Sequence, residues 1–320
     1  MSATLFVQEP DAEFARRPGA HRAPSRGSLA GPSAVTRIRP ELSAGVAVTK
    51  AVLTLFSLMM IWLVLYAVVL SGLQEERTQH GLYAALRAQL AAETAPAGGV
   101  IKPGKPVALL DAPDIRLHDE VIVEGTSSAT LQKGPGHLAN TVLPGQAGVS
   151  AVLGKSVTFG GPFASIPKLH MGNPITVTTV QGVAHYVVTD VRRGGDPLPA
   201  PLAAGQGRLT LVAVVGPGWR SGWAPTGLVY VDASLQGIGQ TGPPGRPTQV
   251  PASQQAMGSG STALYSLALW LETMAIVAVG VTWARSRWGG WQVWLAGAPL
   301  LLATVWIVTE TATRLLPNLL

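Results

Sequence analysis

The chain has 320 residues, of which 47% are hydrophobic and only 12% charged, and its formal net charge is +6. Soluble globular proteins carry about 25% charged residues, so this composition excludes an ordinary soluble enzyme and indicates a membrane protein. The sequence contains no cysteine. Disulfides, thiolate metal sites and cysteine nucleophiles are therefore excluded.

Residues 1–50 mix Pro, Gly, Ala, Ser and Arg without apolar periodicity, and they carry seven basic against four acidic side chains. This composition predicts a disordered basic tail. A tail that only sets the membrane orientation is favoured over one that docks a partner or anionic lipid.

Residues 51–73 form an uncharged, mostly apolar run. A helix of this length, at about 1.5 Å per residue, is roughly 35 Å long and can cross a hydrocarbon core of about 30 Å. We therefore predict a first transmembrane helix, since a cleaved signal peptide would start near residue 1 and be shorter. Residues 74–105 are predicted to form a stalk helix, in which apolar residues recur three and four positions apart, followed by a Gly- and Pro-rich linker.

Residues 106–235 are predicted to form a single, mainly β, extracytoplasmic domain. The short β-type runs in it are 107–110, 121–123, 149–153, 175–180, 185–191, 209–215 and 228–231. Many short strands between glycine-rich turns, with almost no helical period, favour a closed or nearly closed β-barrel. The Gly- and Pro-rich residues 236–261 are predicted to be a flexible linker back to the membrane.

Two further apolar segments, 262–284 and 291–313, are predicted to be transmembrane helices. The short hairpin between them carries Arg285 and Arg287 and no acidic residue. The positive-inside rule then places this hairpin and the basic tail in the cytoplasm, and residues 74–261 outside the cell. Because topology explains the basic excess, nucleic-acid binding finds no support.

Charged side chains within these two segments are the exceptions to their apolar character. Glu272 in the second span costs about 2.5–3.5 kcal/mol at the centre of a bilayer. We expect it to face the other spans or another protein. Glu310, near the end of the third span, has Arg314 four residues further on as a plausible partner.

Five short motifs occur in order through the predicted domain. They are Val-Ile-Val-Glu-Gly-Thr at 121–126, Gly-Pro-Gly-His at 134–137, Leu-Pro-Gly-Gln at 143–146, Gly-Gly-Pro-Phe at 160–163 and Leu-His-Met-Gly at 169–172. Together they resemble the sortases of actinobacteria, and the resemblance extends over about residues 107–235. It implies a sortase-like β-barrel anchored in the cell membrane. In that family the barrel cuts a sorting signal on a secreted protein and joins the new end to a cell-wall amine.

The same resemblance implies a cysteine nucleophile, a histidine and an arginine, and none of the three is present at the matching positions. Lys155 occupies the histidine position, Val214 the cysteine position and Gly227 the arginine position. We therefore expect no catalytic residues, no cofactor and no transpeptidase activity. The expected role is binding or positioning of secreted or cell-wall proteins.

Four residues are candidates for binding: His137, Lys155, Trp219 and Trp223. His137 ends the Gly-Pro-Gly-His motif, where a turn-stabilising or rim role is favoured over a catalytic one. The two tryptophans can cap the mouth of the barrel or bind a peptide or a sugar ring. The remaining histidines lack the short spacing of metal sites, so no metal is expected.

Two alternatives remain open. One is an acyl or peptidyl transferase with relocated chemistry at Lys155 or Ser156, although adjacent residues on a strand point to opposite faces and disfavour a Ser–Lys hydrogen bond. The other is a structural subunit of a membrane assembly held by the three helices, with Glu272 as the main contact. The sequence specifies neither the partner nor the oligomeric state.

Overall fold

The computed structural model describes residues 44–216, 225–258, 263–287 and 290–320. Most of the predicted basic tail, together with Trp219 and Trp223, lies outside these residues. The helices are α1 (Ala44–Leu65), the π-helical η1 (Tyr66–Leu70), α2 (Ser71–Ala91), α3 (Ser128–Leu131), α4 (Ala263–Arg287) and α5 (Gly290–Thr313), with short 3₁₀ turns η2 (Pro113–Ile115), η3 (Ile166–Lys168) and η5 (Ala252–Gln254).

Three helical segments are long and apolar enough to cross a membrane: Ser57–Ala91, Ala263–Arg285 and Trp291–Thr313. One precedes the barrel in sequence and two follow it, which confirms the predicted arrangement of spans. In the first, α1, η1 and α2 follow one another without a break, and α1 begins at Ala44 rather than at residue 51.

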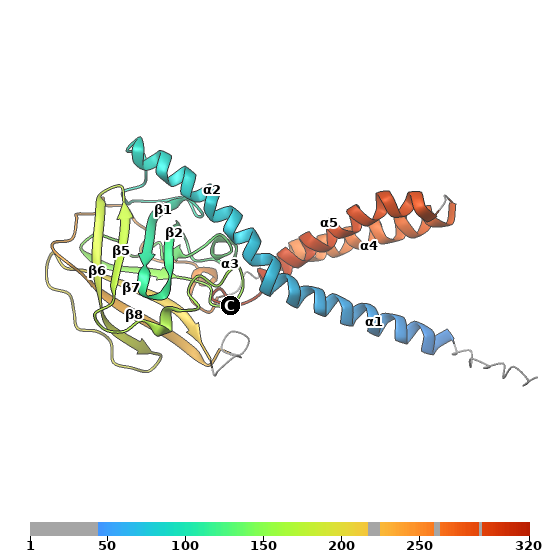
Figure 1. Cartoon of the computed structure of the whole chain (residues 1–320), viewed down its shortest axis with the longest axis horizontal. Helices are drawn as coiled ribbons and strands as arrows, with labels where there is room; N and C mark the ends of the chain where they lie inside the picture. The colour runs from blue at the N-terminus through green and yellow to red at the C-terminus, as the bar shows by residue number, and fades with distance from the viewer. Residues whose placement is uncertain (1–43, 217–224, 259–262, 288–289) are drawn as a thin grey trace, which may run out of the picture. The chain divides into compact units, whose positions relative to one another are not determined.

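The helix α2 continues directly from the first span and packs against the barrel. It lies along the β1–β2 side of the barrel (Figure 1). Leu86 is 1% exposed and packs in one cluster with Val121 of β2. Apolar residues three and four apart form a stripe that is stable only when covered, and the barrel wall covers it.

Eight strands form a closed barrel in the order β1-β2-β3-β4-β7-β8-β6-β5, as predicted from the β-type runs. They are β1 (Pro106–Ala112), β2 (Leu117–Glu124), β3 (Gly136–His137), β4 (Gly148–Leu153), β5 (Pro174–Thr179), β6 (Gly182–Arg193), β7 (Gly207–Val215) and β8 (Gly227–Leu235). The pairs β2–β3 and β4–β7 are parallel and the others antiparallel. The two-residue β3 has no counterpart among the predicted runs.

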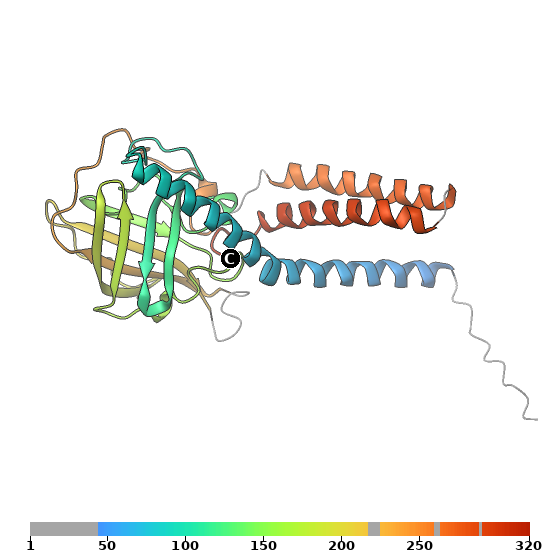
Figure 2. The same ribbon diagram turned by 45° about the horizontal axis from the view of Figure 1, so that its top comes forward.

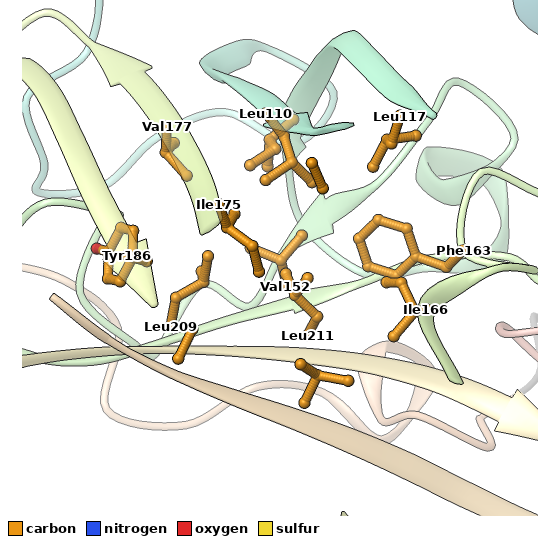
Figure 3. Close-up of a cluster of buried hydrophobic side chains, with 14 of the residues drawn as sticks. Leu110, Leu117, Val152, Phe163, Ile166, Ile175, Val177, Tyr186, Leu209 and Leu211 are labelled. Atoms are coloured by element: carbon orange, nitrogen blue, oxygen red, sulfur yellow. The ribbon is translucent and has the colours of Figure 1, made fainter. Parts of the chain in front are cut away.

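The interior of the barrel is filled by apolar side chains from nearly every strand (Figure 3). On β7, Leu211 and Ala213 belong to this interior core, whereas Val212 and Val214 belong to a second cluster. Successive side chains of a strand point to opposite faces, so the second cluster lies on the outer face of the barrel. We call it the outer cluster.

The segment after β8 contacts the barrel at several points in its described part. Gln240 N donates to Gly145 O at 2.9 Å, and Gln240 O accepts from Ala147 N at 3.0 Å. Further along, Thr126 Oγ1 donates to Gln254 O at 2.5 Å. A Gly- and Pro-rich composition therefore does not prevent main-chain pairing with neighbouring loops.

The apolar helices contact one another. The helices α4 and α5 lie side by side (Figures 1 and 2). Trp62 Nε1 of α1 donates to Thr309 Oγ1 of α5 at 3.2 Å. Arg314 pairs with Glu310 at 2.9 Å, as the four-residue spacing indicated.

Candidate functional site

The three positions assigned by the sortase resemblance lie at one end of neighbouring strands. Lys155 follows the end of β4, which pairs in parallel with β7. Val214 lies near the end of β7, opposite Leu228 of β8, and Gly227 is the first residue of β8. The barrel topology therefore places these chain segments together although they are distant in sequence.

The side chain of Ser156 is bonded to the main chain of β7. Its Oγ donates to Val214 O at 3.3 Å and accepts from Val214 N at 3.2 Å. Within the described part of the chain, no hydrogen bond joins Ser156 to Lys155. The sequence predicts this because adjacent residues of a strand point to opposite faces. In the structure, β4 ends at Leu153, and both residues lie in the loop that follows.

Lys155 is 0% exposed. Its Nζ donates to the main-chain oxygen of Leu320 at 3.1 Å and lies 5.7 Å from the centre of the Phe159 ring. Burial penalises the charged ammonium, so it lowers the pKa of Lys155 to about 7. Near neutral pH this amine is thus present both with and without its extra proton.

The outer cluster lies beside Lys155. Its buried members are Leu131, Leu153, Val212, Val214 and Leu319, with Leu138, Ala151, Leu228, Tyr230, Ala256 and Leu320 packed against them. We call this cluster, together with Lys155, Ser156 and Thr158, the outer site. Leu319 belongs to the segment after α5, so a distant part of the chain completes the apolar surface.

Residues 317–320 form a turn at the outer site, closed by a bond from Leu320 N to Pro317 O at 3.0 Å. Ser156 N donates to Leu319 O at 3.1 Å. Lys155 Nζ and Thr158 Oγ1 both donate to Leu320 O, at 3.1 and 2.5 Å. Two successive main-chain oxygens of this turn are therefore bound by three donors of one loop.

Asn318 fixes the other side of the turn. Its Nδ2 donates to Ser253 O at 2.8 Å and to Gln255 O at 2.7 Å, and its main-chain N donates to Gly258 O at 2.9 Å. The side chain is completely buried. The segment after β8 and the loop after β4 thus hold residues 317–320 between them.

His137 lies in β3 and is 2% exposed. Its Nδ1 is 2.8 Å from Glu124 Oε2, and its Nε2 is 2.9 Å from the Val142 carbonyl oxygen. A carbonyl oxygen only accepts, so Nε2 carries a hydrogen. Both ring nitrogens are used inside the barrel wall, which favours the turn-stabilising role over binding.

The remaining candidates are not brought to the outer site. Trp219 and Trp223 lie outside the described residues. Glu272 lies in α4 with an exposed side chain. Among the residues that the structure describes, it forms no hydrogen bond or ion pair.

Two features of the structure were not indicated by the sequence patterns. The first is the binding of residues 317–320 at the outer site. The only sequence signal for it was a Pro-Asn pair followed by two leucines, which indicates a turn.

The second is a cavity of about 360 Å³ between α2 and β2, which the carboxyl groups of Glu75 and Glu120 line. Burial raises the pKa of Glu120 to about 7. No sequence pattern pairs two glutamates that are this far apart in the chain.

Comparison with known proteins agrees with the motifs. Residues 110–212 match the family model of the sortase domain. A sortase D5 transpeptidase from Clostridium perfringens is 22% identical over 50% of this chain and 99% of its own, with a TM-score of 0.41. A point mutant of sortase E from Streptomyces avermitilis is 30% identical over 43% of this chain and 91% of its own, with a TM-score of 0.34.

Sortase A from Corynebacterium diphtheriae is also similar, with 19% identity over 50% of this chain and 85% of its own and a TM-score of 0.33. None of the curated proteins matches the chain. Because residues 110–212 match the model of the sortase domain, this part of the chain belongs to the sortase family.

Proposed function

We propose that this chain is a membrane-anchored, sortase-like protein without transpeptidase chemistry, and that its outer site holds a segment of a secreted or cell-wall protein. Covalent acyl transfer needs a nucleophile, a group that handles its proton and a donor for the oxyanion. Val214 and Gly227 supply neither a nucleophile nor a cationic donor, and the whole sequence lacks cysteine.

The observation that carries the proposal is the way in which the outer site contacts a peptide. Ser156 N and Lys155 Nζ bond successive main-chain oxygens of the turn at 317–320. The outer cluster surrounds the side chain of Leu319. Main-chain hydrogen bonds with an apolar pocket for one side chain are a general means of peptide recognition, and they require no bond to be broken.

The membrane topology supports a partner outside the cell. The tail at 1–50 and the residues Arg285 and Arg287 carry basic charge on one side of the three spans. Under the positive-inside rule the barrel then faces the exterior, where secreted and cell-wall proteins occur.

Site-specific photo-crosslinking in intact cells tests the proposal. A photoreactive residue is placed at Leu228, in the outer site, and for comparison at Val183, which is 56% exposed on β6. We expect crosslinks to a secreted or cell-wall protein from position 228 and not from position 183. Crosslinks that are equal at the two positions, or absent from both, would contradict the proposal.

The burial of Lys155 favours a second candidate, a peptidyl transferase with relocated chemistry. A lysine with a pKa near 7 is partly neutral, and its Nζ can take the proton of an acceptor amine that attacks a peptide carbonyl and return it to the departing amine. Mass spectrometry of a sorting-signal peptide incubated with the full chain and an amine distinguishes the two candidates. Cleavage or transfer that disappears in Lys155→Met would establish the enzyme, and an unchanged peptide would exclude it.

A further inference from the structure

The turn at 317–320 occupies the outer site as a ligand would. Lys155 and Leu320 are 165 positions apart in sequence, so their contact is tertiary and does not follow from local chain geometry. Leu319 is 0% exposed within the outer cluster. The side chain of Leu319 is buried, Asn318 Nδ2 has two acceptors, and two main-chain oxygens of the turn have donors, whereas Asn318 Oδ1 has no partner among the described residues.

The contacts fall on three separate parts of the barrel. The loop after β4 binds the oxygens of Leu319 and Leu320. The outer faces of β4, β7 and β8 enclose the Leu319 side chain. The segment after β8 accepts hydrogen bonds from Asn318. Loss of the turn would expose the apolar cluster and remove the hydrogen-bond acceptor of Lys155.

We infer that residues 317–320 are an intramolecular ligand of the outer site, which an external peptide of the same chemistry must displace. That chemistry is a Pro-Asn turn followed by leucines, with the asparagine amide bonded and the first leucine buried. The inference rests on the proposed function, because it specifies both the ligand class of the same site and the condition for its access.

Tethering gives the internal ligand an advantage over an added peptide. A segment joined by a short flexible connection has an effective concentration on the order of millimolar at its site. A site that is free for only a fraction of the time binds external ligand more weakly by that fraction. We expect the occupied outer site to bind an added peptide at least about tenfold more weakly than a vacant outer site does.

Thiol labelling of the full chain in detergent tests whether the turn is held. Because the native sequence has no cysteine, Leu319→Cys introduces a single thiol. We expect maleimide to label this thiol at least about tenfold more slowly than the thiol of Val183→Cys, since labelling requires local opening of the turn. Equal rates at the two positions would overturn the inference.

Displacement is tested with the amidated hexapeptide Leu-Leu-Pro-Asn-Leu-Leu, which has the sequence of residues 315–320. We expect this peptide, at about 1 mM, to accelerate labelling of Leu319→Cys severalfold by competing with the tethered turn, and to leave Val183→Cys unchanged. A peptide with aspartate as its fifth residue should have no effect. Acceleration by both peptides, or by neither, would overturn the inference.

A variant with a vacant site gives the affinity directly. In Leu319→Asp the buried leucine becomes a charged residue that the outer cluster cannot accommodate. Fluorescence anisotropy should show that the labelled hexapeptide binds Leu319→Asp about tenfold more tightly than the wild type. Equal affinity would contradict an internal ligand. Photo-crosslinking from Leu228 addresses the proposed function separately, so a failure there leaves the labelling results intact.

Discussion

Lys155 is an ionisable side chain buried in an apolar environment, and its burial couples folding to pH. In the folded chain its pKa is lowered from 10.5 to about 7. Between these values the unfolded chain binds a proton that the folded chain does not. The stability of the barrel is therefore expected to rise with pH across this window, as the cost of burying the charge disappears.

We predict that Lys155→Met removes this pH dependence. Methionine has a similar volume and no charge, so at pH 7 the variant should be more stable by about 1–4 kcal/mol, as when other buried ionic groups are replaced by apolar ones. Thermal unfolding of the full chain in detergent between about pH 6.5 and pH 9.5 measures the effect. The control is Lys168→Met, at an exposed position. If the stability of Lys155→Met still rises with pH, the pH dependence does not come from Lys155.

Glu120 makes stability depend on pH in the opposite direction. Its pKa is raised from 4.5 to about 7 by burial. Between pH 4.5 and about pH 7 the folded chain holds a proton that the unfolded chain has lost. The free energy of unfolding is therefore highest below pH 4.5 and decreases as the pH rises towards 7. At higher pH the charged carboxylate remains buried in the cavity beside Glu75.

We predict that Glu120→Gln raises the unfolding temperature at pH 8 by about 2–4 °C, which corresponds to roughly 1 kcal/mol in a domain of this size. The variant should equal the wild type at about pH 4.5, where Glu120 is protonated in the folded chain. Asp119→Asn, at the exposed neighbouring position, serves as the control. An increase in unfolding temperature that is the same at pH 4.5 and pH 8 would show that the charge of Glu120 is not its cause.

At the scale of elements, α2 is attached to the barrel by hydrogen bonds as well as by apolar contacts. Gln79 Oε1 accepts from Val121 N at 2.8 Å, and Gln79 Nε2 donates to Val121 O at 3.1 Å and to Lys133 O at 2.8 Å. One amide thus pairs both main-chain groups of a residue in β2. The helix that leaves the membrane is in this way fixed to the wall of the barrel.

We predict that Gln79→Leu destabilises the barrel by about 1–3 kcal/mol, because the buried amide of Val121 loses its acceptor. Chemical unfolding of the full chain in detergent, followed by circular dichroism, measures the loss. Arg77→Ala, exposed on the same helix, should change stability by less than about 0.5 kcal/mol. Equal effects of the two substitutions would indicate that helix propensity, and not the hydrogen bonds, is responsible.

At the scale of the whole molecule, Glu272 is a polar site on an otherwise apolar surface. It lies in α4 with its side chain exposed. A carboxylate within a membrane span is costly unless a protein or a polar neighbour solvates it. A further membrane protein, or a second copy of this chain, would supply such a neighbour.

We predict that Glu272→Leu lowers the mass of the complex extracted in mild detergent and leaves hexapeptide binding at the outer site unchanged. Size-exclusion chromatography with light scattering measures the mass. Thr282→Val, also exposed on α4, is the control and should not change it. An unaltered mass in Glu272→Leu would remove the support for an assembly role of this residue.

Much of the architecture could be predicted because it depends on patterns that are local in sequence. Long apolar runs indicated the three spans, and β-type runs indicated all strands except β3, whose two residues are too few for a pattern. The coverage of α2 could not be predicted, since an amphipathic stripe does not specify its partner. The segment at 236–258 has the composition of a linker, and its contacts with the barrel, such as those of Gln240, could not be predicted from that composition.

The sortase resemblance singled out two residues of the outer site, Lys155 and Val214, because they match positions of the family's catalytic residues. No sequence pattern indicated the rest of the outer site. The contact of Lys155 with Leu320 joins residues 165 positions apart, and no local pattern encodes it. The burial that lowers the pKa of this lysine is likewise a property of the tertiary fold and could not be predicted from a local pattern.

The short connection between α5 and the outer site limits where a ligand can be bound. The helix ends at Thr313, and Leu320 is seven residues further on. Even a fully extended chain of that length reaches only about 25 Å. The outer site therefore lies within about 25 Å of the end of the third span. A polypeptide that is still leaving the membrane, or is anchored in it, comes within this distance, whereas one already placed deep in the cell wall does not.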